Sequence, residues 1–403
     1  MEVIDLSGAV AVPPAAAELI PEAYARSLDL LRRNSTADGI LACSHGERAA
    51  GRHYSSIFGR DAAICALGMA ASGQADLVAT AVAGLRTLAR YQAANGQIPK
   101  YVKPEKGEVD FWYSGCIDAT LWWLIAVHQI DRQRDGELGR ELAEAVARAL
   151  QWLQCQEHPV WGLLQQNEAS DWADIMPRSG FVLYSNALWY WVKRLYRLPG
   201  GKLTRDYANY LFFPFGPSVP EQRRARLLAH YIRNRCRPTA FYLSFVNFSF
   251  WGEEIDIFGN LLAALTGVAD GSRSVQVAEG IKSLGVARPW PVRVVGRPID
   301  PDDPLWRLYM QRHRQNYPFQ YHNGGCWPFV GGFWVLLLAR LGWKGQAREE
   351  LANLAAANQV GDWQFNEWLH GRSGEPLGMP GQSWNAAMYL LAHAAVFEKK
   401  QVF

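Results

Sequence analysis

The chain has 403 residues, of which 49% are hydrophobic and 20% charged, and its formal net charge is +3. This composition is typical of a globular protein with a large core and excludes extensive disorder. The lysines and arginines are scattered along the chain, which argues against nucleic acid as the main partner, because phosphate binding needs a concentrated basic face.

Helical periodicity dominates the sequence and predicts twelve helices with Gly- and Pro-containing connections. The expected helices are 15–34, 61–72, 75–93, 116–130, 138–155, 181–197, 220–235, 256–267, 273–283, 328–341, 345–357 and 383–397. Short strands in loops are expected at 241–250 and 292–295. Without a fixed sequence repeat, a solenoid is disfavoured. We therefore expect six antiparallel helix pairs closed into an all-α (α/α)6 barrel, forming one domain over 1–403 with residues 1–14 flexible.

The cysteines and the N-terminus indicate the compartment. None of the six cysteines has a metal-ligand spacing, and they resemble reduced cysteines of a cytosolic protein. The first residues carry acids and no basic stretch, which is unlike a signal peptide. No apolar run reaches the roughly 18 residues that a membrane helix needs. We expect a cytoplasmic protein that needs no metal or other cofactor and has no membrane partner.

Five polar segments directly precede predicted helices. They are FGRD before 61–72, YSGCID before 116–130, SDWADIMPRSG before 181–197, YHNGGCWP before 328–341 and MPGQSW before 383–397. If alternate helices line a barrel, these segments gather at one end and form one pocket.

The segment from Asn167 to Gly180 has the composition expected of a proton donor. Hydrolysis of a glycosidic bond needs two carboxyl groups, one to protonate the leaving oxygen and one to activate water or attack carbon. Glu168, Asp171 and Asp174 lie among Trp, Ile and Met, and crowded acids in apolar surroundings have their pKa values driven apart. The alternative is an acidic loop that caps the next helix.

The segment from Asp362 to Gly371 suits the second carboxyl group. Glu367 lies between Asn366 and Trp368, an arrangement that could hold a water molecule and cover one face of a sugar. The alternative is an exposed Glu in a turn.

Further polar residues suit the binding of sugar hydroxyls. Asp61, preceded by Arg60, is either a helix N-cap or an acceptor of hydrogen bonds from hydroxyls, and Asp118 has the same two interpretations. His322 is expected to be a hydrogen-bond partner and not a metal ligand, because no second His has ligand spacing. The 17 Trp residues either stack on sugar rings or fill a helical core.

Taken in chain order, these segments resemble the (α/α)6-barrel inverting glycosidases, and most closely the alkaline/neutral invertases. Debranching-type amylo-α-1,6-glucosidases and the glucosidase/trehalase group share parts of the pattern. The resemblance rests on the YHNGGCWP run at 321–328, on Glu367 followed by Gly371, and on Gln382 followed by Trp384.

This resemblance, which covers roughly residues 40–398, implies an inverting, exo-acting glycoside hydrolase. Asp174 would donate the proton and Glu367 would activate water, with Asp171 as the alternative acid. The expected substrate-binding residues are Arg60, Asp61, Asp118, Asp171, Trp172, His322, Asn323, Trp327, Trp363, Trp368 and Gln382. We expect sucrose as substrate; the alternatives are α-1,6-linked maltooligosaccharides, trehalose and glucosylglycerate.

Two other classes of function stay open. A sugar epimerase or isomerase on the same barrel would use two His residues in one pocket, and His53, His322 and His370 are the candidates. A sugar-binding protein without catalysis is the other. The aromatic-rich segment 241–251 is either core or an interface in a homo-oligomer.

Overall fold

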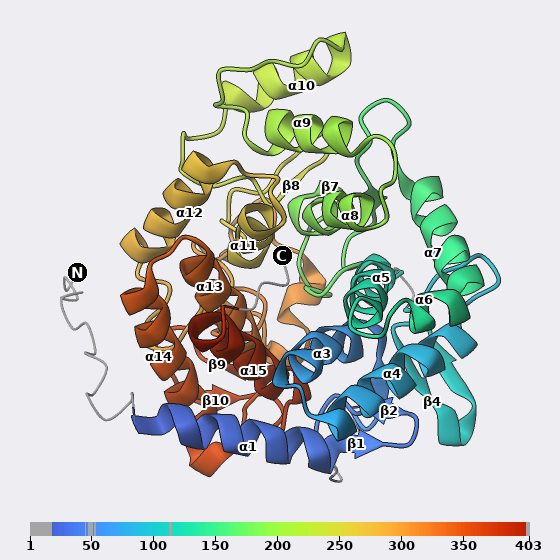
Figure 1. Cartoon of the computed structure of the whole chain (residues 1–403). Coiled ribbons are helices and arrows are strands. Elements are labelled where there is room, and N and C mark those ends of the chain that lie inside the picture. Colours follow the sequence, from blue (N-terminus) through green and yellow to red (C-terminus); the bar gives the residue numbers. More distant parts are fainter. Residues whose placement is uncertain (1–17, 45, 47–50, 52–53, 113–114, 400–403) are drawn as a thin grey trace.

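The computed structural model describes residues 18–44, 46, 51, 54–112 and 115–399. Its helices form two concentric layers (Figure 1). The inner layer consists of α3 (Gly59–Ser72), α5 (Ile117–Asp131), α8 (Leu183–Leu195), α11 (Ile257–Thr266), α13 (Pro328–Arg340) and α15 (Ser383–Phe397). The outer layer consists of α1 (Leu19–Asn34), α4 (Ala75–Arg90), α7 (Ala143–Gln156), α9 (Gly201–Phe212), α12 (Gly271–Ser283) and α14 (Lys344–Trp363).

The inner helices close into a ring. Each packs against the next in chain order, from α3 through α5, α8, α11 and α13 to α15, and α15 packs back against α3. The expected (α/α)6 barrel is thereby confirmed. The residues proposed as a flexible segment, 1–14, lie outside the described part of the chain.

Burial explains which helices occupy which layer. In α3 every residue from Gly59 to Ala71 is buried, as expected of a helix that is surrounded by others. In α4 only one face is buried, and Leu77, Ala81 and Leu85 recur on it at intervals of four residues. An outer helix therefore needs one apolar stripe, whereas an inner helix needs apolar or small residues all round.

The region 198–235 differs from the prediction. Helix α9 was not predicted, yet it packs on α8 in the outer layer. Its stripe of Thr204, Tyr207, Ala208 and Leu211 has helical spacing, but two glycines at its start and polar residues of low helix propensity weaken the signal. The predicted helix at 220–235 is α10 (Arg223–Arg233), which lies outside the two layers (Figure 1).

The described strands are short and lie in the connections. They are β1 (Ser35–Thr36), β2 (Gly39–Ile40), β3 (Ile57–Phe58), β4 (Tyr101–Lys103), β5 (Glu108–Asp110), β6 (Gln165–Gln166), β7 (Gly180–Val182), β8 (Phe245–Val246), β9 (Trp368–Leu369) and β10 (Pro376–Leu377). All pairings are antiparallel, in the orders β1-β2, β3-β4-β5, β6-β7-β8 and β9-β10. The expected strand at 292–295 forms only isolated bridges.

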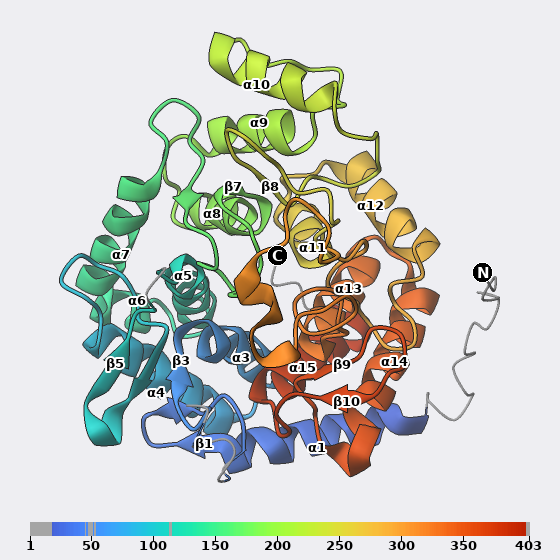
Figure 2. The same ribbon diagram turned by 180° about the vertical axis from the view of Figure 1, so that it is seen from behind.

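Three shorter helices complete the described elements. Helix α6 (Glu137–Glu141) precedes α7, so the single helix predicted at 138–155 is divided in two. The 3-10 helices are η2 (Pro104–Lys106) and η3 (Leu308–Arg314). Because the inner helices all run in the same direction, the segments that precede them meet at one end of the ring, where Figure 2 shows β3, β5, β7, β8, β9 and β10.

Candidate active site

A cavity of about 350 Å³ opens at this end of the ring. It is lined by polar side chains from the starts of inner helices and by aromatic rings from the connections. The lining residues are Tyr54, Phe58, Arg60, Asp61, Lys100, Tyr101, Asp110, Trp112, Trp172, Asp174, Tyr321, His322, Trp327, Glu367 and Trp384. Seven of the predicted site residues are therefore brought to one cavity, and both predicted catalytic carboxylates are among them.

Asp174 lies in the connection between β6 and β7, and its side chain is 23% exposed. Its Oδ2 is 3.0 Å from the Nζ of Lys100, and its Oδ1 is 3.8 Å from the Nδ1 of His322. Burial raises the pKa of Asp174, but the positive charge of Lys100 and the effect of His322 outweigh it and hold the pKa below the usual value. This carboxyl group therefore favours the charged form.

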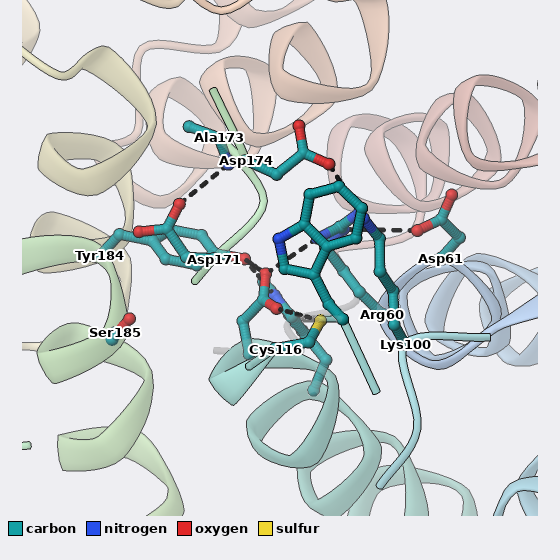
Figure 3. Close-up of polar contacts among 12 residues, drawn as sticks. Arg60, Asp61, Lys100, Cys116, Asp171, Ala173, Asp174, Tyr184 and Ser185 are labelled. Carbon is teal, nitrogen blue, oxygen red and sulfur yellow. Dashed lines mark hydrogen bonds and ion pairs between the residues drawn. The ribbon is translucent and has the colours of Figure 1, made fainter. Parts of the chain in front are cut away.

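Asp171, the alternative acid, is not among the residues that line the cavity. Its Oδ1 accepts a hydrogen bond of 2.8 Å from the backbone N–H of Ala173, and its Oδ2 accepts one of 2.9 Å from Gln166. Figure 3 shows the two carboxylates turned in different directions, Asp171 back toward Ala173 and Asp174 toward Lys100. In this structure the Asp171 carboxylate binds groups of its own loop, and its contact with substrate stays a prediction.

Glu367, just before β9, is 3% exposed and is held at both oxygens. The hydroxyl of Tyr54 donates a hydrogen bond of 2.5 Å to Oε1, and the backbone N–H of Met379 donates one of 2.9 Å to Oε2. Gly378 makes this close approach possible, since a Cβ there would lie 2.5 Å from Oε2. The carboxylate therefore has a fixed orientation.

Tyr321 lines the cavity together with both predicted catalytic groups. Burial raises the pKa of its phenol well above the usual value, and the charges of Glu367 and Asp174 raise it further. The same three causes, with a direct hydrogen bond to Glu367, raise the pKa of Tyr54. Both phenols thus stay protonated, and the charges of the same two carboxylates act on each of them.

A buried ion-pair network forms the floor of the cavity. Arg60 Nη1 is 3.2 Å from Asp118 Oδ2, and Arg60 Nε is 3.3 Å from Asp61 Oδ2. Asp118 also accepts hydrogen bonds from Tyr184, at 3.0 Å, and from the thiol of Cys116, at 3.3 Å (Figure 3). Asp118 is fully buried and holds Arg60 in place, so its predicted contact with a sugar stays a prediction that this arrangement does not favour.

Asp61, in contrast, faces the cavity. Burial raises the pKa of its carboxyl group, although the neighbouring Arg60 lowers it. Its Oδ2 forms the ion pair with Arg60 but accepts no hydrogen bond from the described residues. A hydroxyl-bearing ligand in the cavity could satisfy this oxygen.

Aromatic rings make up one wall of the cavity. Trp172 meets Trp327 edge to face, with ring centroids 5.5 Å apart, and His322 stacks on Trp327 at 5.2 Å. Burial lowers the pKa of His322 to about 3, and Arg60 and Arg178 act in the same direction, although Asp174 opposes them. The imidazole is therefore neutral at ordinary pH, which suits a hydrogen-bond partner of a sugar hydroxyl.

Four other predicted site residues do not line this cavity. Asn323 is fully buried. Its side-chain amide exchanges hydrogen bonds with the backbone N–H and carbonyl of Ile299, and its backbone N–H donates to the side chain of Asn316. Gln382 is the N-cap of α15 and donates to the carbonyl of Met379. These two amides donate to backbone carbonyls, and their binding of substrate stays a prediction.

The two predicted aromatic residues near Glu367 lie elsewhere. The indole of Trp363 donates a 3.0 Å hydrogen bond to Glu22 of α1, and Trp363 is not among the residues that line the cavity. Trp368 lines a neighbouring side cavity that contains Glu367.

Several residues of the cavity were not predicted from the sequence. Lys100, Tyr54 and Trp112 lie outside the quoted motifs, and no local pattern marks them. Trp384 and Tyr321 were part of the motifs but were not assigned to the site. The ammonium of Lys100 also lies 3.4 Å from the centre of the Trp112 ring.

The described residues contain no group of three or more His, Cys, Asp or Glu side chains placed to hold a metal ion. Within the same part of the chain, no helix combines the length and the apolar character needed to cross a membrane.

Comparison with known proteins gives this site a family context. Residues 246–399 match the alkaline and neutral invertase family. The expected resemblance is thereby confirmed for this part of the chain, which includes Glu367. Neutral/alkaline invertase 1 of Oryza sativa subsp. japonica is 29% identical over 143 residues, which cover 33% of this chain and 21% of that protein.

A second relative has another named activity. Glucosylglycerate hydrolase of Mycolicibacterium hassiacum is 37% identical over 73 residues, or 18% of this chain and 16% of that protein. The matched stretches thus span between 16% and 25% of the curated relatives.

Solved structures match over nearly the whole chain. The GH63 mannosylglycerate hydrolase of Thermus thermophilus has a TM-score of 0.65 at 16% identity, with 91% of this chain and 99% of that chain covered. A bacterial glucoamylase has a TM-score of 0.60 at 14% identity, with 94% and 56% covered. At these identities the likeness establishes the barrel fold.

Proposed function

We propose that this protein is an inverting, exo-acting glycoside hydrolase in which Asp174 is the general acid and Glu367 the general base. Asp174 donates a proton to the glycosidic oxygen as the bond to the anomeric carbon breaks. Glu367 takes a proton from a water molecule that attacks the same carbon from the opposite face, so that the released sugar has the inverted configuration. No further group is required for this reaction.

The observation that carries the proposal is the placement of the two carboxylates. They come from segments almost 200 positions apart in the chain, yet they line one cavity. The charges of both also raise the pKa of the same phenol, that of Tyr321. Arg60, which lines the cavity, is held from behind by Asp118, which in turn accepts a hydrogen bond from Tyr184.

The family match supports sucrose as the first substrate to test, because the matched relatives are named invertases. Glucosylglycerate is the second candidate, supported by the relative that is 37% identical over 73 residues. We place α-1,6-linked maltooligosaccharides and trehalose after these two.

An epimerase or isomerase with two catalytic His residues has less support. Burial lowers the pKa of His322 and keeps it neutral. His370 is not among the residues that line the cavity, and its Nδ1 accepts hydrogen bonds from backbone N–H groups of its own turn. His53 lies outside the described residues. A binding protein without catalysis would not need two carboxylates with fixed orientations.

Two substitutions test the catalytic roles. Asp174→Asn and Glu367→Gln are each expected to lower kcat by about 10²–10⁴-fold, the range that general acid–base groups contribute. The exposed residues Asp302 and Glu105 offer matched controls, and Asp302→Asn and Glu105→Gln should leave kcat unchanged. Circular dichroism and the thermal midpoint should show that all four variants fold. Full activity in either site variant would refute the assignment.

The substrate and the stereochemistry follow from one measurement. Proton NMR of fresh digests of sucrose, glucosylglycerate, trehalose and an α-1,6-linked oligosaccharide should show which is cleaved and which anomer appears first. We expect the β-anomer from an α-glucoside. The α-anomer as first product would contradict inversion, and incorporation of solvent deuterium without cleavage would favour an isomerase.

A further inference from the structure

A run of three basic residues, two of them arginines, lies across the mouth of the barrel. Arg312, His313 and Arg314 end the 3-10 helix η3, which is the orange segment in front of the centre of the ring in Figure 2. All three are exposed. Two side cavities open beside the main cavity, and this run contributes to both.

The two side cavities differ in which catalytic carboxylate they contain. The larger, of about 350 Å³, contains Asp174 together with Arg312 and His313. The smaller, of about 220 Å³, contains Glu367 and Arg314. We call the larger one the acid-side chamber. In the proposed reaction the departing group receives its proton from Asp174, so the acid-side chamber is where the leaving group would lie.

The charges in the acid-side chamber do not balance. Glu168 is neutralised by Arg307, at 3.0 Å, and also accepts a 2.9 Å hydrogen bond from Tyr309. Asp174 is paired with Lys100. Among the described residues Arg312 forms no ion pair, so its guanidinium is a surplus positive charge in the chamber.

The backbone that carries Arg312 is anchored at both ends. On one side Met310 is fully buried, and on the other the amide of Asn316 donates a 2.8 Å hydrogen bond to the carbonyl of Ile175, which lines the same chamber. Between them His313 has a φ of 62°, a left-handed conformation that costs a non-glycine residue free energy. Such strain in an anchored segment is typical of functional sites.

We infer that the acid-side chamber binds an anionic leaving group, with the guanidinium of Arg312 as its ion-pair partner. The ligand class is a hexose joined to a small group that carries a carboxylate or a phosphate, and guanidinium binds either through paired N–H donors. This inference rests on the proposed hydrolase function and on Asp174 as its acid. It would make a charged glycoside a better substrate than its neutral counterpart.

Matched substrate pairs test the inference. The first pair is glucosylglycerate against glucosylglycerol, in which a hydroxymethyl group replaces the carboxylate. The second pair is sucrose phosphorylated on the fructose unit against sucrose. Wild-type enzyme should show a lower KM for the charged member of one pair. A response in the first pair alone indicates carboxylate, and a response in the second pair alone indicates phosphate.

Substitutions at position 312 locate the effect. Arg312→Gln should raise KM for the charged substrate by about tenfold, the value of one charge-assisted hydrogen bond. It should change kcat little and should leave KM for the neutral substrate unchanged. Arg312→Lys should restore part of the loss, and 0.5 M NaCl should weaken the preference because the site is exposed. Arg226→Gln, on α10, is the matched control with no expected effect.

Failure of the inference and failure of the proposed function give different results. If wild-type enzyme hydrolyses the neutral and charged members of both pairs equally well, the inference is wrong and the hydrolase function stands. If none of these four compounds is cleaved, and trehalose and the α-1,6-linked oligosaccharide are not cleaved either, the proposed function is wrong. Titration calorimetry of the four compounds then still decides whether Arg312 selects anions. Equal dissociation constants within both pairs would then overturn the inference as well.

Discussion

The ammonium of Lys100 lies 3.0 Å from the carboxylate of Asp174 and 3.4 Å from the centre of the Trp112 ring. A general acid must be protonated when substrate binds, yet this ion pair favours the charged form of Asp174. In the proposed mechanism Asp174 must therefore be protonated, although the positive charge of Lys100 disfavours protonation.

This relationship predicts how activity depends on pH. Activity should fall as the pH rises through the pKa of the acid in the free enzyme. Lys100→Met removes the positive charge, raises the pKa of Asp174, and should move the alkaline limb of the kcat/KM profile to higher pH. Lys100→Arg keeps the charge and should leave the limb in place. An alkaline limb at the same pH in both variants would show that Asp174 is not the titrating acid.

A second prediction concerns the orientation of Glu367. Tyr54→Phe removes the donor to Oε1 but leaves the Met379 N–H on Oε2, so the carboxylate keeps one of its two anchors. We expect kcat to fall about tenfold or more, because a hydrogen bond to a charged group contributes about 1.5–3 kcal/mol. Tyr91→Phe, at the end of α4, should have wild-type kcat. A Tyr54→Phe enzyme with unchanged kcat would remove this tyrosine from the mechanism.

The sequence predicted the part of the site that is local. Asp174 and Glu367 lie in short segments where acids are mixed with Trp, and the positions of these segments before inner helices bring them to one end of the barrel. Lys100 and Tyr54 carry no such signal. Each meets its partner across a long sequence separation, 74 positions for Lys100 and Asp174 and 313 for Tyr54 and Glu367, which only the closed ring determines.

Two of the predicted residues that do not line the cavity share a physical feature. Asn323 and Gln382 are amides at or near the starts of inner helices, where backbone N–H and C=O groups need partners when they are buried. In the structure both side-chain amides donate to backbone carbonyls, Asn323 to that of Ile299 and Gln382 to that of Met379. A motif can therefore identify which segments border a site without showing which side chains in it face the cavity.

The third prediction concerns a buried cluster behind the site. Arg178 lies 3.2 Å from both Glu254 and Asp256, and all three side chains are at most 1% exposed. Burial raises the pKa of Asp256 to about 6; Arg178 lowers it, and Glu254 raises it further. Because this folded-state pKa is above the unfolded value of 3.8, the protonated form favours folding, and its contribution is complete below about pH 4 and lost as the pH rises through about 6.

The sign of this pH dependence can be measured by comparison with Asp256→Asn, whose side chain cannot titrate. As the pH rises from 4 to 7, the free energy of unfolding of the wild type should fall relative to the variant by on the order of 3 kcal/mol. Urea denaturation at several pH values gives this difference, and subtracting the variant cancels the other titrating groups. A difference that is constant with pH, or that grows in the opposite direction, would contradict the assignment.

The last prediction concerns the contact that closes the ring. Helices α3 and α15 approach so closely at Gly68 that a Cβ there would lie 2.0 Å from the carbonyl oxygen of Ala387. Gly68→Ala should therefore separate the two helices and lower the free energy of unfolding by about 1–3 kcal/mol or more, although alanine has the higher helix propensity.

The matched control is Gly271→Ala, at the start of α12. A Cβ at this position meets nothing within 4 Å, so the substitution should be neutral or stabilising by about 0.4–1 kcal/mol. Because both changes add one methyl group to a helix, propensity affects both in the same direction, and opposite signs in urea denaturation would isolate the packing of α3 against α15. Equal stabilisation by the two substitutions would mean that the inner ring has room at this point.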